Sequence, residues 1–279
     1  MTIGEADAAD CLQQLRTDDY DRYLCTVLAP PSQRAGLAAL YALNLDVAKI
    51  REQVHEPMLG QIRLQWWREA VDELKAGRPR SQPALRVLAQ TGAAATLDIG
   101  VLQKLLDARE QDFRPEALAT LSDLVTYAAD TGGALQRLAL GLLGESEPEV
   151  TTAGEAVGTA WALIGLVRAV PFHVASGRPV LAQDLVLRAG LAVSDIAPGS
   201  AALSRAVAEV MAVATPMLRQ GRMVRAPRQA LPVMMLGRLA RQYARAIERA
   251  GYDPFAPQLA LSPLRRQWSV VLGAMMGRG

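Results

Sequence analysis

The chain has 279 residues, of which 51% are hydrophobic and only 5% aromatic, and its formal net charge at pH 7 is +2. This length suits one large domain or two small ones, with a sizeable core. The acidic N-terminal sequence lacks the apolar region of a signal peptide, and no run of about 18 apolar residues is uninterrupted, so neither a signal peptide nor a membrane span is predicted. Cys11 and Cys25, far from any metal-binding pattern, are interpreted as reduced intracellular thiols.

Helix-favouring Ala and Leu dominate, and no stretch alternates polar and apolar residues as a strand does. Residues 21–28 predict a first helix that ends at Pro30-Pro31. Residues 32–54 predict a second helix with Ser32 as its N-cap, and residues 61–77 a third with Gly77 at its C-terminal end. Two further helices are predicted over 81–93 and 96–113.

Residues 120–144 predict a long helix with a weak point at Gly132-Gly133, and residues 149–170 another that ends or kinks near Pro171. Helices over 200–220 and 230–250 and a short one in 263–279 complete the chain. The fold class is therefore all-α: one domain, 1–279, of about ten helices, with an ordered core of about 17–265.

Charge is distributed unevenly along the chain. Residues 201–279 hold 12 basic and 3 acidic side chains, whereas residues 1–200 hold 18 and 25. The surface candidates are Arg219, Arg222, Arg225 and Arg228. An anionic lipid surface or a subunit of a membrane complex would suit them, and so would acidic groups of the same chain. Nucleic acid is disfavoured because aromatic side chains for stacking are scarce there.

Two helical faces carry the positions of greatest interest. Residues 165, 169 and 173 are four apart and share a face, as do residues 48 and 52. Acids at such positions on two helices facing one cavity would hold Mg²⁺, which bridges to the phosphates of a diphosphate leaving group. Asp46 lies on a different face from residue 48.

The order of segments 39–52, 62–74, 127–138, 157–184 and 243–255 resembles the squalene/phytoene synthase family over about residues 17–265. The resemblance implies a helical bundle around a central cavity, in which acids of two motifs bind Mg²⁺ and two prenyl diphosphates are joined. At those acid positions this chain has Ala48, Glu52, Ala169 and His173. Leu45, Ala162 and Gly165 replace further polar residues of the family pattern.

The segment containing Gln65-Trp66-Trp67-Arg68 is similar to one branch of the family, that of the mitochondrial complex I assembly factor and its bacterial relatives. This resemblance implies a non-enzymatic factor in complex I assembly, with no metal and no catalytic residue, cytoplasmic or peripheral at the inner membrane. A lipid or isoprenoid in the cavity is a further hypothesis. The alternative is an active Mg²⁺-dependent prenyl diphosphate transferase that uses acids at other positions: Asp46, Glu52, Asp123, Asp130 or Asp184.

The cavity or ligand-binding candidates are Asp46, Arg51, Glu52, Arg168 and His173. Arg168 lies among apolar residues and needs a partner. Either it forms a structural ion pair with Glu52, or it belongs with Arg51 to a remnant anion pocket. His173 is either a hydrogen-bonded structural residue or a pH-sensitive ligand. Of the adjacent tryptophans, at least one is expected in the core.

Overall fold

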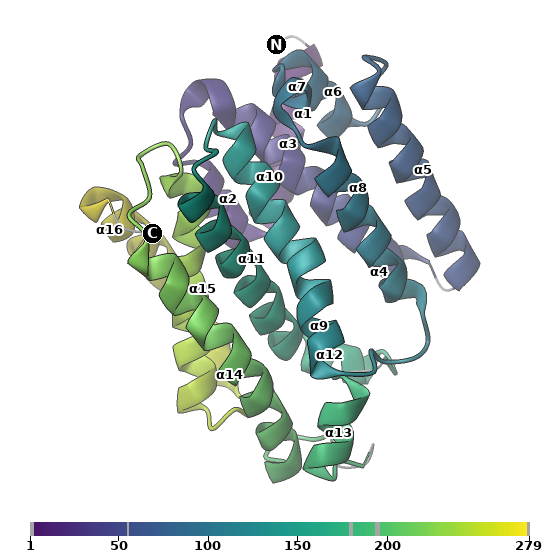
Figure 1. Cartoon of the computed structure of the whole chain (residues 1–279), viewed down its shortest axis with the longest axis vertical. Helices are drawn as coiled ribbons and strands as arrows, with labels where there is room; N and C mark the ends of the chain where they lie inside the picture. The colour runs from purple at the N-terminus through teal and green to yellow at the C-terminus, as the bar shows by residue number, and fades with distance from the viewer. Residues whose placement is uncertain (1–2, 55, 179–180, 193–195, 278–279) are drawn as a thin grey trace.

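The computed structural model describes residues 3–54, 56–178, 181–192 and 196–277, and every regular element in these ranges is a helix. Helix α11 (Pro148–Arg168) lies at the centre and packs against α10 (Ala134–Leu142), α14 (Ala201–Met223) and α15 (Leu231–Arg249) (Figure 1). Two hydrophobic clusters share the chain, one mostly N-terminal and one mostly C-terminal, and Trp161 of α11 packs against both. The prediction of an all-α fold is confirmed.

Within residues 3–54 and 56–113, which the structure describes, the first half of the bundle consists of nine short or medium helices. They are α1 (Ile3–Asp18), α2 (Tyr20–Thr26), α3 (Pro31–Ala48), α4 (Ile50–Gln53), α5 (Pro57–Lys75), α6 (Pro83–Gln90), α7 (Ala93–Thr96), α8 (Ile99–Ala108) and the 3₁₀ helix η1 (Arg109–Phe113). Ser32 is not an N-cap: Pro30 precedes the helix and Pro31 occupies its first turn, where a missing N–H costs nothing. Gly77 adopts a φ of 75° just after α5, as predicted for a helix end.

Helix α1 was not predicted, and it extends the packed structure beyond the expected core of 17–265. Its Cys11 and Leu15 are buried in the first hydrophobic cluster, and both cysteines of the chain are free and buried. Val270 of the last helix, α16 (Pro263–Met276), is buried in the same cluster. Both ends of the chain therefore contribute to the core.

The predicted helix 120–144 is three elements: α9 (Leu121–Ala128), a π-helical turn η2 (Ala129–Gly133) and α10. The wide turn falls on the predicted weak point, Gly132-Gly133. A methyl group on Gly158 of α11 would collide with the carbonyl oxygen of Gly132, so both glycines are needed for the backbones to approach. The second half is completed by α12 (Val170–Ala175), α13 (Gln183–Ala189) and η4 (Pro257–Leu259).

Two helices have the length and apolar composition of a membrane span, α11 and α14, although the sequence predicts none. The most apolar window of α11 has a mean hydropathy of 1.3 and is 56% buried within the fold, and the corresponding window of α14 is 39% buried. A core helix of a soluble protein meets the same criterion, and α11 occupies that position here. The two helices are therefore weak evidence for a span.

Candidate functional site

Both helices that carry the predicted motif positions break at the motif. Helix α3 ends at Ala48 and α4 begins at Ile50, whereas α11 ends at Arg168 and α12 begins at Val170. The intervening residues remain close to helical, with φ and ψ of −84° and −6° at Lys49 and −83° and −4° at Ala169. The N–H of His173 donates to the oxygen of Ala169 at 2.9 Å, so the predicted spacing of four residues survives the break.

These four positions do not supply the ligands that Mg²⁺ prefers. Only Glu52 is a carboxylate, and it is exposed; Ala48 and Ala169 have no donor atom, and the imidazole of His173 suits softer metals. Within the described ranges, no group of three or more His, Cys, Asp or Glu side chains could hold a metal ion. The residues present therefore do not fit a Mg²⁺ cluster.

The acids that the transferase alternative would use at other positions form local polar contacts or are exposed to solvent. Asp46 accepts hydrogen bonds from Gln14 at 2.5 Å and from Gln82 at 2.7 Å. Asp123 closes a capping box with Thr120 at the start of α9. Asp184 pairs with Arg188 at 2.8 Å, and Asp130 is exposed on η2.

The predicted ion pair between Arg168 and Glu52 is wrong. None of the ion pairs in the described residues joins them; instead, the guanidinium of Arg168 lies over the ring of Tyr243, 3.7 Å from its centroid. Arg51 donates to the carbonyl oxygen of Val54 at 3.1 Å, so its contact is with the backbone after α4. A cation over an aromatic face is a favourable contact, and Arg168 thereby gains an interaction partner inside the bundle.

The central polar group of the bundle is Asp21, which the sequence did not single out. Its side chain is buried, and it accepts a hydrogen bond from the hydroxyl of Tyr243 at 2.8 Å and one from Arg266 at 3.3 Å. Helices α2, α15 and α16, which lie far apart in sequence, therefore meet at one carboxylate. Asp21 shares a helical face with the buried Leu24 and Cys25, and this was the available sequence signal.

Arg168 adds positive charge near Asp21, and Arg22 lies among the neighbouring aromatic rings. Arg22 pairs with Asp19 at 2.7 Å, and its guanidinium lies 5.5 Å from the ring centroid of Tyr41 and 5.8 Å from that of Trp161. Trp161 in turn meets Tyr243 edge to face. We call Asp21, Arg22, Arg168, Tyr243 and Arg266 the central cluster.

Burial controls protonation in the central cluster. Loss of solvent raises the pKa of Asp21, although the hydrogen bond from Tyr243 and the charge of Arg266 act in the opposite direction. Burial, together with the nearby Asp21, raises the pKa of Tyr243 to about 12, so this hydroxyl remains a donor at neutral pH. The cluster resembles a structural ion network more than a set of groups ready to exchange protons.

His173 is half-buried next to a separate polar group. The hydroxyl of Tyr127 donates to Asp112 at 2.6 Å, and Arg109 donates to Tyr127 at 3.0 Å. Burial, and then the charge of Arg178, lower the pKa of His173, while the charge of Asp112 acts to raise it. The Nδ1 atom of His173 is buried without a hydrogen-bond partner, so the expectation of a hydrogen-bonded structural histidine is not met at that atom.

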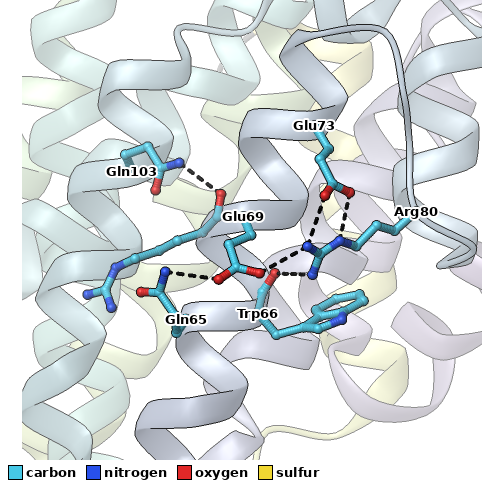
Figure 2. Close-up of polar contacts among 7 residues, drawn as sticks. Gln65, Trp66, Glu69, Glu73, Arg80 and Gln103 are labelled. Carbon is cyan, nitrogen blue, oxygen red and sulfur yellow. Dashed lines mark hydrogen bonds and ion pairs between the residues drawn. The ribbon is translucent and has the colours of Figure 1, made fainter.

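The two tryptophans have different surroundings. Trp67 is buried, whereas Trp66 is partly exposed and lies under the guanidinium of Arg80 at 5.0 Å. Figure 2 shows how Arg80 connects Glu69, Glu73 and the carbonyl oxygen of Trp66. The core prediction is confirmed for Trp67, and Trp66 belongs to a surface that is fixed by a carboxylate-paired arginine.

The predicted arginine surface borders a groove of about 1500 Å³ between the end of α14, the connection to α15, and helices α15 and α16. We call it the arginine groove. Its lining includes seven arginines and no acidic side chain: Arg222, Arg225, Arg228, Arg238, Arg241, Arg245 and Arg265. Three of the four predicted residues lie there, whereas Arg219 lines a neighbouring hollow with Glu248. Arg265 was missed.

Comparison with known proteins agrees with this architecture. The squalene/phytoene synthase family model matches residues 15–270. Complex I assembly factor 6 of Rattus norvegicus is 28% identical over 253 residues, which cover 89% of this chain and 76% of the relative. A phytoene synthase of Cereibacter sphaeroides is 26% identical over 200 residues, covering 69% and 56%.

The fold has a matching solved structure. A dehydrosqualene synthase crystal structure superposes with a TM-score of 0.85 and 16% identity, covering 98% of this chain and 97% of that one. At this identity the likeness concerns the fold alone, and the match of the family model over nearly the whole sequence carries the assignment. The chain belongs to the squalene/phytoene synthase family.

Proposed function

We propose that this protein is a non-catalytic factor in the assembly of respiratory complex I, the NADH:ubiquinone oxidoreductase, and that it works at the membrane surface. The observation that carries the proposal is the donor set at the motif breaks, where Ala48 and Ala169 stand and Glu52 is the one carboxylate. Ionisation of a prenyl diphosphate needs Mg²⁺ to stabilise the leaving diphosphate. Without a set of carboxylates, this step lacks its metal.

The relatives support the assembly role. Proteins from rat, cattle and mouse that align with 89% of this chain bear the name complex I assembly factor 6. A phytoene synthase of Cereibacter sphaeroides matches 69% of the chain, which is similar to the 66% matched by the human assembly factor 6, so coverage does not separate the two groups. Fold alone does not decide between the two functions, and the donor set at the motif breaks supports the non-catalytic one.

The first test is calorimetric titration with Mg²⁺ and a non-hydrolysable farnesyl diphosphate analogue. We expect binding, if any, to be independent of Mg²⁺. The matched variant restores carboxylates at three positions, Ala48→Asp, Ala169→Asp and His173→Asp, and should gain Mg²⁺-dependent binding if the helices keep the family geometry. Tight Mg²⁺-dependent binding by the unaltered protein would overturn the non-catalytic part of the proposal and support the transferase alternative.

The second test addresses assembly directly. Deletion of the gene should lower the amount of mature complex I and its NADH:ubiquinone activity in membranes, and the unaltered gene should restore both. A variant with Glu52→Gln should restore them equally well, because the proposal gives that carboxylate no catalytic task. Normal complex I in the deletion strain would contradict the assembly role.

A lipid or isoprenoid ligand of the central cavity is a further part of the proposal. The rings of Tyr41, Trp161 and Tyr243 lie next to the guanidinium groups of Arg22 and Arg168 inside the bundle, and they would supply apolar surface and positive charge for such a ligand. Native mass spectrometry of the purified protein would detect such a ligand. Replacing Trp161 with Ala should change its occupancy, and a ligand-free spectrum under conditions that preserve lipid complexes would remove this part.

A further inference from the structure

The arginine groove gathers like charges, and its lining in the described residues includes no acidic side chain. Arg222, Arg225, Arg228, Arg245 and Arg265 take part in none of the ion pairs found in the part of the chain that the structure describes. The acidic half of the chain therefore does not neutralise these five side chains. Repulsion of this kind is relieved when an anion binds.

The pKa of Arg241 reflects the same concentration of positive charge. Burial, followed by the charges of Arg222, Arg238 and Arg245, lowers the pKa of Arg241 to about 10. Each cause disfavours the charged form, as expected where guanidinium groups converge on a partly desolvated space. The negative charge of a bound anion would oppose the effect of these three arginines on the pKa of Arg241.

An apolar surface lies directly beside these charges, on α16. Leu264, Trp268, Val271, Leu272 and Met275 are between 44% and 80% exposed. Their spacing of three or four residues places them on one face of the helix. Trp268, Leu272 and Met275 also line the arginine groove, so charge and apolar surface adjoin each other there. Helix α16 lies at one edge of the molecule (Figure 1).

We propose that the arginine groove binds the phosphates of anionic phospholipids while the apolar face of α16 lies in the membrane interface. Arginine suits phosphate because its planar guanidinium can donate two parallel hydrogen bonds. A helix with exposed apolar side chains beside basic ones is the pattern of an interfacial helix, and Trp is favoured at that depth. The proposal rests on the membrane placement proposed above, but it does not depend on whether the central cavity is catalytic.

Other kinds of anion would contact only part of the surface formed by the arginine groove and the apolar face of α16. Free phosphate or diphosphate would use the arginines and leave the apolar face of α16 exposed to water. A single-stranded nucleic acid would need several aromatic side chains for stacking, and Trp268 is the one aromatic residue among those that line the groove. An acidic peptide also matches the charge of the groove, so polyglutamate is one of the ligands to be tested.

The experiment measures flotation of the full chain with two kinds of vesicle, phosphatidylcholine alone and phosphatidylcholine with about 30% phosphatidylglycerol. The Arg225→Gln/Arg228→Gln variant removes two exposed groove arginines. Its control, Arg16→Gln/Arg114→Gln, removes the same charge from exposed positions on other elements. We expect binding to the anionic vesicles alone, falling about tenfold or more in the groove variant and little in the control.

A second pair of variants tests the apolar face. Trp268→Gln should weaken vesicle binding severalfold, whereas Leu187→Gln, at another exposed apolar position, on α13, should not. Four tryptophans contribute to fluorescence, so the Trp268 signal is obtained by subtracting the spectrum of the Trp268→Phe variant. That signal should shift to shorter wavelength on anionic vesicles.

Several outcomes would overturn the proposal. They are equal binding to both vesicles, equal loss in the groove variant and its control, and an unchanged Trp268 signal on binding. Binding of pyrophosphate, polyglutamate or single-stranded RNA through Arg225 and Arg228, with no binding to vesicles, would assign the groove to another anion. The vesicle assay contains no complex I, so failure here is distinct from failure of the gene-deletion test.

Discussion

Two consecutive arginines of α16 have opposite environments. Arg266 lies half-buried and contacts Asp21 at 3.3 Å in the central cluster, whereas Arg265 is exposed and lines the arginine groove. Helix α16 therefore contributes Arg266 to the central cluster, while the preceding residue, Arg265, carries its charge at the surface. The difference is the presence of a carboxylate.

The same contrast separates the two edges of the molecule. Arg80, in the connection after α5, is matched by Glu69 and Glu73 of that helix, so its charge is satisfied within the fold (Figure 2). Helix α16 lies at the opposite edge in Figure 1, and the groove arginines Arg225, Arg228 and Arg265 take part in none of the ion pairs among the described residues. Arginine thus serves as a structural connector at one edge and is available for an external anion at the other.

The largest effect is expected at the centre of the cluster. Asp21→Ala would leave Arg266 and the hydroxyl of Tyr243 without their buried acceptor, and we expect it to lower the free energy of unfolding by about 3–5 kcal/mol. Urea denaturation measures this change. Asp21→Asn should cost less, because its amide oxygen still accepts from Tyr243. A loss below about 1 kcal/mol for Asp21→Ala would show that the cluster contributes little to stability.

A matched pair of arginines tests the contrast itself. Arg86 makes two hydrogen bonds with the buried Asp7, so Arg86→Gln should cost about 1–3 kcal/mol of unfolding free energy. Arg228→Gln, in the groove, should change it by less than about 0.5 kcal/mol. Thermal unfolding of both variants in the same buffer gives the comparison. Equal losses would mean that the groove arginines are structural after all.

The hydroxyl of Tyr243 should contribute a smaller amount. Tyr243→Phe removes the hydrogen bond to Asp21 and keeps the ring under Arg168, so we expect a loss of about 1 kcal/mol. Tyr23→Phe is the control, because the ring of Tyr23 stacks on Tyr20 at the edge of the bundle. If both variants lose the same amount, the bond to Asp21 is not the cause.

The smallest effect is a pH dependence from His173. Burial and Arg178 place its folded pKa below the ordinary 6.5, so the unfolded chain takes up the proton more readily than the folded protein. Its contribution to stability is full above pH 6.5 and is lost as the pH falls through the folded pKa. Solvent exposure limits the effect to about one or two degrees of melting temperature between roughly pH 7 and 5. His173→Gln should remove this part of the pH profile, and an unchanged profile would contradict the assignment.

Local sequence signals predicted much of the scaffold. Prolines and glycines marked the ends of α5 and α11, and Gly132-Gly133 marked the π-helical turn, because backbone freedom and missing donors act within a few residues. Spacing also placed Ala169 and His173 correctly relative to each other. The resemblance to the family predicted the all-α fold from the sequence alone.

The central cluster could not be predicted in the same way. Asp21 is 222 residues from Tyr243 and 245 from Arg266, and only tertiary packing brings them together. The sequence left two alternatives for Arg168, an ion pair with Glu52 or an anion pocket with Arg51, and the structure instead places its guanidinium over the ring of Tyr243. The run of arginines in the sequence predicted one wall of the groove. The position of its second wall, α16, depends on tertiary packing.

The close approach of Gly158 and Gly132 divides α11 into two parts with different tolerance to mutation. Any side chain at Gly158 would collide with the backbone of η2, whereas a methyl group at Gly165 would meet nothing within 4 Å. The last turns of the helix, at Gly165, can therefore accept a new side chain, while the contact at Gly158, about two turns away, keeps the helices in register. Under the proposed function, this gives a physical route by which a motif position could change without loss of the fold.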